Sequence, residues 1–358
     1  MTSYKELLQL LIDRQLSQDE EFQTTDFWEF ATKQLTEILE KNEIQRFRSD
    51  SACLSYFVPT YGHPGLGLST EQTNEIYKIS ADGSLKQQQL LSNFVTGKSH
   101  AIADHRVIKA CTMALGFNPF MNFNESDVGQ PSEQFIFDEK RYSRPTQNYM
   151  LGLLFLLSHE CNATLNSVVE IGGGHGALGE ILYKSELEVD RYINFDIPPT
   201  CIFAEYYLSQ VFKDRFGSNL FDPWQQPIEI KDLKGLHVRP NWDIQKLNGP
   251  VDLFVNYHSF QEMEPFVVRR YLEEIFRLEP SYLLLRNIRE GKQKKTTGHA
   301  GVNEPIKATD YESWLTPMYE LEASDSQIFG FITADGFHSE LSLWKLKQYP
   351  GKAEESHS

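Results

Sequence analysis

The sequence is short of positive charge. It has 34 Lys and Arg residues against 50 Asp and Glu residues in 358, which gives a formal net charge of −16. Proteins that bind nucleic acids rely on Lys and Arg side chains to neutralise phosphates. We therefore expect no nucleic-acid partner. The acidity favours solubility and indicates nothing about the fold.

Long hydrophobic runs and clustered cysteines are scarce too. The longest strongly apolar stretch, Met150–Leu157, contains a glycine and is far shorter than the ~20 residues of a membrane-spanning helix. The N-terminus lacks the apolar core and cleavage site of a signal peptide. We therefore expect a cytoplasmic protein with no membrane partner. The four cysteines form no CxxC pair and no zinc-type spacing, which predicts free thiols in a reducing compartment: Cys53, Cys111, Cys161 and Cys201.

The residue patterns divide the chain into three parts. Length alone predicts two domains, or one large domain with an extension. Residues 1–135 show helical periodicity, including an apolar stripe capped by Asp26, and are interrupted by loops at 51–67 and 118–131. Residues 136–348 are predicted to form the main α/β domain, and the polar residues 349–358 a disordered tail.

Short apolar runs alternate with helical patterns in the second part. This alternation is typical of a parallel β-sheet covered by helices on both faces. Near the C-terminus, residues 327–333 and 338–346 flank an Asp-Gly pair, which predicts an antiparallel hairpin. The predicted parallel strands are 167–171, 192–195, 236–239, 251–257 and 282–285.

A glycine-rich loop follows the first of these strands, which ends at Glu170 and Ile171. Glycine allows a sharp turn and a close approach of the backbone to a ligand, and the loop amides are expected to face that ligand. The loop contains the G-x-G-x-x-G pattern of dinucleotide sites. Glu170, placed before the glycines, favours instead S-adenosylmethionine, which has a cationic amino-acid end. The glycines are Gly172, Gly173, Gly174 and Gly176.

An acidic residue ends the second predicted strand. Asp196 lies twenty residues after Gly176. A carboxylate at this spacing accepts hydrogen bonds from ribose hydroxyls in nucleotide-binding folds. Asp196 therefore supports a ribose-containing ligand without distinguishing S-adenosylmethionine from NAD.

With these motifs in view, the chain resembles the class I S-adenosylmethionine-dependent methyltransferases and, more narrowly, the sugar O-methyltransferase family. The resemblance covers residues 140–348. It implies a Rossmann-like seven-stranded methyltransferase sheet, mostly parallel with an antiparallel C-terminal hairpin, and a mainly helical N-terminal extension that covers the acceptor. The similar segments are 169–176, 195–208 (FDIPPTCIFAEYYL), 252–263 (DLFVNYHSFQEM) and 282–292 (YLLLRNIREGK).

The resemblance also implies which residues hold the cofactor. The glycine loop and the acid before it would cradle the methionine and ribose portions, and the end of the second strand would bind the ribose. The acid after the third strand would hold the adenine amino group, and an asparagine at the end of the fourth would lie beside the cofactor. These residues are Glu170, Gly172, Gly173, Gly174, Gly176, Asp196, Ile197, Asp243, Ile244 and Asn256.

Methyl transfer to a hydroxyl group needs a general base, or a metal that lowers the pKa of the hydroxyl. His258 is the first candidate for the base, because imidazole accepts a proton near neutral pH. Glu262, four residues later, is a second base, or orients His258, or holds substrate hydroxyls. No recognised metal spacing occurs. A divalent metal stays open, with Asp196, Asp252, His258 and Glu262 as the available ligands.

Two further groups of residues bear on the acceptor. A basic run after the last parallel strand either neutralises a substrate phosphate or carboxylate, as in a nucleotide-sugar, or forms a solvated surface loop. Three aromatic residues of the N-terminal region either line a sugar site or pack in the core. The basic run is Arg286, Arg289, Lys292, Lys294 and Lys295, and the aromatic residues are Tyr56, Phe57 and Tyr61.

Several functions therefore stay open. The expected one is methyl transfer to a small-molecule hydroxyl of a sugar, nucleotide-sugar or glycoside. The alternatives are an NAD(P)-dependent oxidoreductase, an O-methyltransferase for a non-sugar natural product, and a non-catalytic protein that binds the cofactor or a partner. A homodimer is compatible with the sequence.

Overall fold

The computed structural model describes residues 4–57, 70–217, 220–295, 301–333 and 336–348. The predicted tail 349–358, together with Tyr61 and Asp335, lies outside the described residues. None of the described helices is long and apolar enough to cross a membrane. All four cysteines are unpaired, as predicted.

Seven strands lie side by side in the central sheet: β10 (Tyr319–Asp325), β12 (His338–Leu346), β9 (Tyr282–Ile288), β8 (Leu253–Tyr257), β3 (Ser167–Ile171), β4 (Arg191–Asp196) and β6 (Gly235–Pro240). The five strands from β9 to β6 are parallel to one another. β12 is antiparallel to both β9 and β10. The predicted fold class, a mostly parallel Rossmann-like methyltransferase sheet with an antiparallel C-terminal part, is confirmed.

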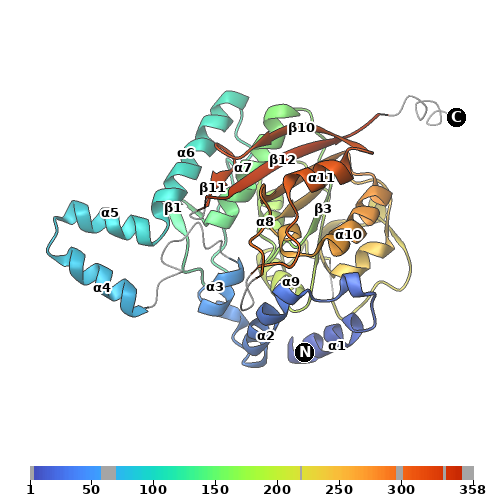
Figure 1. Cartoon of the computed structure of the whole chain (residues 1–358), viewed down its shortest axis with the longest axis horizontal. Helices are drawn as coiled ribbons and strands as arrows, with labels where there is room; N and C mark the ends of the chain where they lie inside the picture. The colour runs from blue at the N-terminus through green and yellow to red at the C-terminus, as the bar shows by residue number, and fades with distance from the viewer. Residues whose placement is uncertain (1–3, 58–69, 218–219, 296–300, 334–335, 349–358) are drawn as a thin grey trace.

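Apolar side chains explain why β3 and β8 are central. Every residue of both strands is buried, as expected for parallel strands covered on both faces. The register places Val168 between Tyr192 of β4 and Leu253 of β8. Figure 1 shows helices on both sides of the sheet. They are α7 (Arg144–His159), α8 (Ala177–Lys184), α9 (Thr200–Val211), α10 (Pro265–Leu278) and α11 (Ala308–Leu315).

The N-terminal region is mainly helical, as predicted. It contains α1 (Tyr4–Gln15), η1 (Glu20–Phe22), α2 (Asp26–Glu40), α3 (Ser51–Phe57), α4 (Thr70–Ala81), α5 (Leu85–Val95) and α6 (Lys98–Leu115), followed by the short hairpin β1 (Phe135–Phe137) and β2 (Lys140–Tyr142). α6 packs along α7, and η1 packs against α10. This region and the sheet therefore share one hydrophobic core. The domain boundary at residue 135 stays a prediction.

Two predictions in the N-terminal region are wrong. The segment 51–67, expected to be irregular, begins with α3, since Pro and Gly appear only from Pro59 onward. The Asp50 carboxylate accepts the backbone N–H of Ala52 at 2.9 Å and so supports the first turn of this helix. The N-cap of α2 is Thr25 rather than Asp26, which is already helical.

The C-terminal hairpin also differs from its prediction. Its first strand is reduced to β11 (Phe331–Ile332), which pairs with β12 over two residues. The longer antiparallel partner of β12 is β10, at the edge of the sheet. β10 carries Glu320 and Glu322 at exposed positions, so its sequence has no apolar run that would predict a strand.

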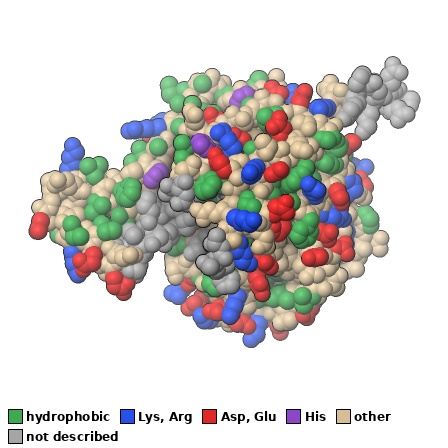
Figure 2. Space-filling model, viewed as in Figure 1, with side chains coloured by type: hydrophobic (Ala, Val, Ile, Leu, Met, Phe, Trp, Pro, Cys, Tyr) green, Lys and Arg blue, Asp and Glu red, His purple; other side chains and the backbone are tan. Residues whose placement is uncertain are grey.

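A two-helix arm formed by α4 and α5 projects away from the sheet (Figure 1). The side chain of Ser84 and that of Gln87 form a capping box at the start of α5. Apolar side chains stand exposed on this arm, including Ile79 (79%) and Leu85 (84%), and hydrophobic atoms are visible on it in Figure 2. No described residue of the arm lines the main cavity at the carboxyl ends of the parallel strands.

Candidate active site

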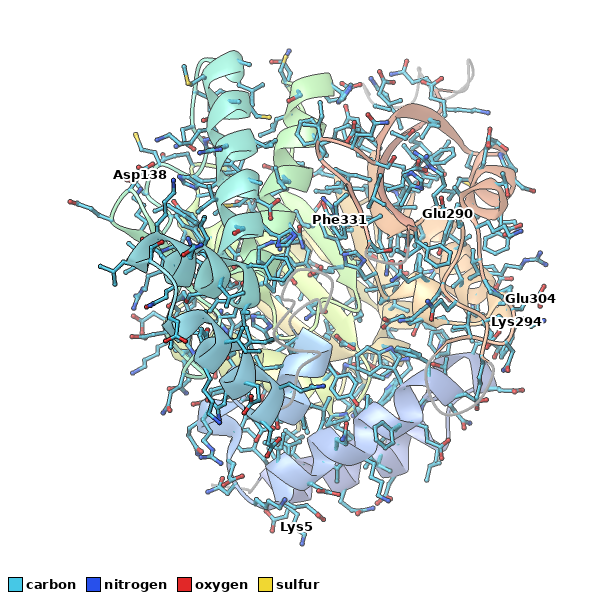
Figure 3. All side chains as sticks on the ribbon, turned by 60° about the vertical axis from the view of Figure 1, so that its left-hand side comes forward. Lys5, Asp138, Glu290, Lys294, Glu304 and Phe331 are labelled. Carbon is cyan, nitrogen blue, oxygen red and sulfur yellow. The ribbon has the colours of Figure 1, made fainter. Side chains whose placement is uncertain are left out.

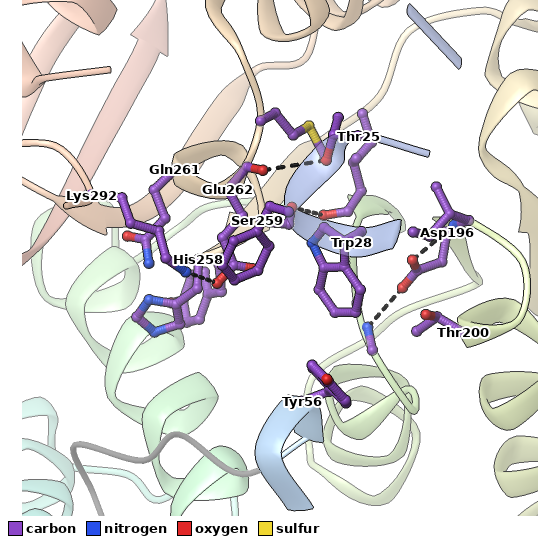
Figure 4. Close-up of a pocket in the computed structure, with 18 of the residues that line it drawn as sticks. Thr25, Trp28, Tyr56, Asp196, Thr200, His258, Ser259, Gln261, Glu262 and Lys292 are labelled. Carbon is purple, nitrogen blue, oxygen red and sulfur yellow. Dashed lines mark hydrogen bonds and ion pairs between the residues drawn. The ribbon is translucent and has the colours of Figure 1, made fainter. Parts of the chain in front are cut away.

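The main cavity among the described residues lies at the carboxyl ends of β3, β4 and β8. Its volume is about 620 Å³, within the usual range for small-molecule sites. Ligands of open α/β sheets bind at this edge of the sheet. Figure 4 shows Asp196 and Thr200 on one side and His258 with Lys292 on the other. We call these the Asp196 end (Gly172–Gly174, Asp196, Thr200, Asn241) and the His258 end (Phe27, His258, Glu262, Lys292).

The glycine loop forms the floor of the Asp196 end. Gly172 has a φ of 72° and Gly174 a φ of 58°, a left-handed conformation that favours glycine. A Cβ atom at Gly172 would overlap the side chain of Ser259, and one at Gly173 would overlap the carboxylate of Glu170. The loop therefore requires glycine for its backbone turn and for close packing.

The loop amides do not face the cavity as expected. Gly172 donates its N–H to the carbonyl of Phe195 at 2.8 Å, and Gly173 donates to the side chain of Asn194 at 3.2 Å. Gly174 donates to a carboxylate oxygen of Asp196 at 3.0 Å. Oxygen atoms of β4 thus accept hydrogen bonds from all three amides, so the loop is held by internal hydrogen bonds. The three glycines contribute backbone atoms without side chains to the cavity surface.

Asp196 lines the cavity at the end of β4, as the sequence predicted for a ribose ligand. Besides the Gly174 amide, it accepts the N–H of Ile197 at 2.8 Å, so each carboxylate oxygen accepts one backbone bond. Each oxygen retains capacity to accept a further hydroxyl. Burial raises the pKa of Asp196 to about 8, although the two backbone bonds oppose this shift. Ile197 also lines the cavity.

Two residues of the Asp196 end were missed from the sequence. Thr200 opens α9, and Asn241 opens the 3-10 helix η6 (Asn241–Lys246) that follows β6; both line the cavity. The Asn241 amide donates to the carbonyl of Phe22 at 2.9 Å and to the hydroxyl of Tyr271 at 2.8 Å, which fixes its orientation. Its Oδ1 atom, and the hydroxyl of Thr200, are buried and have no hydrogen-bond partner among the described residues. Such atoms are costly unless a ligand pairs with them.

Glu170 lies below the glycine loop and does not line the cavity. Its carboxylate accepts the hydroxyl of Tyr149 at 2.6 Å and that of Tyr192. Burial raises its pKa to about 7, against the effect of these two hydrogen bonds. This placement differs from the predicted contact with the cofactor, because two tyrosines occupy both oxygens of the carboxylate.

Asp243 also lies away from the cavity. It is fully buried in ion pairs with Arg239, at 2.6 Å, and with Lys246, at 3.2 Å. Asn241, two residues earlier, lines the cavity instead. Sequence reasoning missed this because η6 turns the chain directly after Pro240.

Three other predicted residues do not line the cavity and pack beneath it. Gly176, with a φ of 91°, precedes α8 and faces Leu208. Ile244 packs in the core. Asn256 is buried at the end of β8, where it donates to the carbonyl of Ile171 at 3.0 Å and accepts the N–H of Phe260 at 3.2 Å. Asn256 thereby joins the glycine loop to the segment that carries His258.

His258 lines the opposite end of the cavity, in a left-handed conformation with a φ of 65° directly after β8. Its backbone N–H donates to the carbonyl of Arg286 at 2.8 Å, which fixes the turn. Burial, together with the positive charges of Arg286 and Lys292, lowers the pKa of His258 to about 3. The imidazole is therefore uncharged at neutral pH and a weak base, so the expectation that it accepts a proton near neutral pH is wrong.

Glu262 is joined to Lys292 in an ion pair on the wall of the cavity. The Lys292 ammonium also lies 3.8 Å from the centre of the Phe27 ring, in a cation–π arrangement. Thr25 approaches the backbone carbonyl of Glu262 at 3.5 Å. The His258 end therefore joins the loop after β9, the 3-10 helix η7 (Phe260–Glu262) and the start of α2.

The basic run does not act as one group. Arg286 is fully buried in β9, Arg289 pairs with Glu340, and Lys295 pairs with Asp26 at 3.2 Å. Lys294 is exposed and lies at the outer edge of the molecule in Figure 3. Of the run, Lys292 lines the cavity.

Aromatic side chains from the N-terminal region form a wall between the two ends. Trp28 and Tyr56 lie between Asp196 and His258 in Figure 4, with ring centres 5.7 Å apart. Phe27 and Phe57 line the cavity as well. Tyr56 and Phe57 were candidates for such a wall. Phe27 and Trp28 were missed, because their spacing in α2 is that of an ordinary apolar helix stripe.

The described residues contain no cluster of three or more His, Cys, Asp or Glu side chains that could hold a metal ion. Asp252, one of the available ligands, instead accepts the backbone N–H of Ser167 at 2.8 Å. His175 is buried against Phe57 and Tyr207, where burial lowers its pKa.

The residues of the Asp196 end fit an adenosine-containing cofactor. A buried, unpartnered amide oxygen at Asn241 would accept an exocyclic amino group, and Asp196 has capacity for ribose hydroxyls. The bare glycine loop leaves room for a ligand close to the backbone.

Comparisons with known proteins give fold likenesses alone. No family model matches the chain, and no curated protein matches it. A magnesium protoporphyrin IX methyltransferase from Synechocystis PCC 6803 with bound SAH is 12% identical over 56% of this chain and 86% of its own, with a TM-score of 0.38. The small RNA methyltransferase HEN1 is 14% identical over 61% of this chain and 27% of its own, with a TM-score of 0.40. A protein in the NADB-Rossmann superfamily from Streptococcus agalactiae is 12% identical over 58% and 70%, with a TM-score of 0.34. Likenesses of this size carry no functional argument, so the fold class rests on the strand order of the chain itself.

Proposed function

We propose that the chain transfers a methyl group from S-adenosylmethionine to a hydroxyl oxygen of a small molecule, such as a sugar or glycoside. The observation that carries this proposal is the Asp196 end, where a bare glycine loop, a carboxylate and two unpartnered buried oxygens meet in one cavity. Asp196 would hold the ribose, and Asn241 the adenine amino group.

Four amides of the glycine loop are not available to the pyrophosphate of a dinucleotide. A pyrophosphate binds to free backbone N–H groups of the glycine loop and the following helix. Here the amides of Gly172, Gly173 and Gly174 are bonded inside the protein, and the amide of Gly176 donates to the carbonyl of Gly173 at 3.0 Å. S-adenosylmethionine has no phosphate and does not need these donors. The hydrogen bonds of the loop therefore favour S-adenosylmethionine over NAD(P).

The His258 end would hold the acceptor hydroxyl. When bound, S-adenosylmethionine supplies an electrophilic methyl group. His258, uncharged at neutral pH, can accept a hydrogen bond from the hydroxyl and orient it. Glu262 lies four residues away on the same wall and is the second acceptor for the hydroxyl proton. The aromatic wall of Trp28 and Tyr56 would exclude water from the reacting groups.

The aromatic wall supports a sugar ring as the acceptor. The rings of Phe27, Trp28 and Tyr56 are partly exposed and line the cavity. Such rings offer flat apolar surface, while nearby polar groups orient a ligand. A pyranose has this combination of an apolar face and a polar rim.

The test is calorimetric titration of the purified chain with S-adenosylmethionine, S-adenosylhomocysteine and NADPH, followed by an assay of S-adenosylhomocysteine release with a panel of hydroxyl acceptors. We expect micromolar binding of the first two ligands, none of NADPH, and acceptor-dependent release. Binding of NADPH alone would overturn the proposal. Cofactor binding without turnover across a broad acceptor panel would instead indicate a non-catalytic protein.

A further inference from the structure

The charges of the cavity wall bear on which acceptors it can take. Among the described residues that line the cavity, three are acidic and one is a Lys or Arg. The acidic residues are Glu21, Asp196 and Glu262, and the cation is Lys292. The internal segments outside the description, 58–69, 218–219, 296–300 and 334–335, contain no Lys or Arg in their sequence. No further ammonium or guanidinium group can therefore come from them.

Lys292 is not available as an anion receptor. Its ammonium is paired with the carboxylate of Glu262 and lies over the Phe27 ring. Both side chains of the pair are largely buried, at 22% and 16% exposure. A phosphate would have to displace Glu262 from Lys292 and leave a carboxylate without its partner, which is costly at a part-buried site.

Neutral polar groups also line the cavity. The ring of Tyr149 in α7 stacks on that of Tyr257 at 4.7 Å, and its hydroxyl bonds to Glu170 below the glycine loop, so this part of α7 lies between the two ends of the cavity. The neighbouring Asn148 lines the cavity and is 4% exposed, and its Oδ1 atom has no hydrogen-bond partner in the part of the chain that the structure describes. A buried amide oxygen of this kind is suited to a hydroxyl donor.

We infer that the His258 end takes an uncharged, polyhydroxylated ring, with Asn148 as a specificity-determining hydrogen-bond acceptor and Lys292 as a positioning residue for Glu262. This inference rests on the proposed function and narrows its substrate class. A nucleotide-sugar or sugar phosphate, which the basic run first indicated, is disfavoured.

The main experiment compares methyl glycosides with their phosphate monoesters in the assay of S-adenosylhomocysteine release. We expect kcat/KM to be at least about tenfold higher for the neutral member of a pair, because like charges placed together cost binding energy. Lys292→Gln should lower kcat on the neutral acceptor with little change in KM, and Lys292→Arg should restore part of it. Asn148→Ala should raise KM. Lys294→Gln, at an exposed position of the same loop, is the matched control.

A preference for the phosphate ester that Lys292→Gln abolishes would overturn the inference while leaving the proposed function intact. Failure of the chain to bind S-adenosylmethionine would instead refute the proposed function.

If no glycoside is methylated, quenching of Trp28 fluorescence by ions tests whether the cavity attracts anions. The Trp28 signal is obtained as the difference between the wild-type protein and Trp28→Phe. We expect its ratio of iodide to caesium quenching at equal ionic strength to lie below that of free N-acetyltryptophanamide, because Lys292 is neutralised by Glu262 and Glu21 adds a negative charge to the wall. An iodide-to-caesium quenching ratio above that of the free compound would show an anion-attracting cavity and overturn the inference.

Discussion

The two ends of the cavity are built in different ways. The Asp196 end comes from the ends of three adjacent parallel strands, β3, β4 and β6, and much of it is backbone. The His258 end combines residues that follow β8 and β9, His258, Glu262 and Lys292, with the side chain of Phe27 from α2, a segment far away in the chain. Parallel strands place their carboxyl ends together in every such sheet, whereas side chains from distant segments meet only through the particular tertiary packing. The difference shows that short sequence patterns predict the glycine loop and the acid of the Asp196 end. The side chains that surround the acceptor are fixed only when distant segments pack together.

The energetics of the two ends differ accordingly. At the Asp196 end, backbone amides and Asp196 satisfy one another before any ligand binds. At the His258 end, an ion pair and a cation–π contact hold three segments together. We therefore expect substitutions at the first end to affect cofactor binding, and substitutions at the second to affect turnover and acceptor binding.

The largest effect is expected for Gly172→Ala. The new Cβ would overlap Ser259, and the left-handed backbone at this position is strained for alanine. Cofactor affinity should fall by on the order of 100-fold, equal to about 2.8 kcal/mol, as measured by calorimetry. Gly116→Ala is the matched control, because Gly116 has a φ of 76° with no atom within 4 Å of an added Cβ. Equal losses in both variants would show that backbone strain alone is responsible.

At the other end, His258→Ala and Glu262→Gln should each lower turnover by about 100-fold, because the first removes the side chain that orients the hydroxyl and the second removes the acceptor of its proton. Cofactor affinity should stay within about twofold of the wild type, since neither side chain lies at the Asp196 end. Turnover is measured in the steady state and affinity by calorimetry. Near-normal turnover in both variants would remove these residues from the chemistry.

Asn241→Ala should reduce cofactor affinity by about tenfold, because it removes the acceptor proposed for the adenine amino group. Asp243→Asn tests the alternative assignment from the sequence. It should lower the melting temperature, since it weakens the ion pair with Arg239, and change cofactor affinity far less. A larger loss of cofactor affinity in Asp243→Asn than in Asn241→Ala would indicate that Asp243 contacts the adenine.

Asp196 gives a pH-dependent prediction for the ligand-free protein. Its pKa is near 4 in an unfolded chain and is raised to about 8 in the folded protein, so the unfolded state loses this proton first. The free energy of unfolding should therefore fall as the pH rises from about 4 to about 8. In Asp196→Asn this fall should be smaller by about 1 kcal/mol or more, measured by denaturant titration at pH 5 and pH 8. Identical pH dependence in both proteins would contradict the buried, protonated carboxyl.

The smallest effect is expected for Trp28→Ala, which removes part of the aromatic wall. KM for the acceptor should rise by about fivefold, with cofactor affinity unchanged, because a partly exposed aromatic contact is worth about 1 kcal/mol. Trp28→Tyr should retain most of the wild-type KM. A larger effect on the cofactor than on the acceptor would show that Trp28 belongs to the Asp196 end.

Much of the fold could be predicted because its signals are short-range. Val168 and Val169 lie in a buried apolar run, and the glycines after Ile171 require a turn, so strand and loop were predicted from adjacent residues. β10 escaped prediction because its side chains are polar at the sheet edge, and α3 because the Pro and Gly residues that follow it dominated the segment. Glu170 and Asp243 were expected at the cavity, yet tyrosine hydroxyls and Arg239 engage them elsewhere.

The sequence by itself determined the alternation of strands and helices, the glycine loop and the acid at the end of the second parallel strand, because hydrophobic periodicity and backbone requirements act over a few residues. The tertiary structure decided that Asn241 rather than Asp243 lines the cavity, that Lys292 neutralises Glu262, and that Phe27 and Trp28 reach the site. These outcomes depend on side-chain contacts between segments up to 265 positions apart, such as Phe27 and Lys292, and no local pattern encodes such contacts.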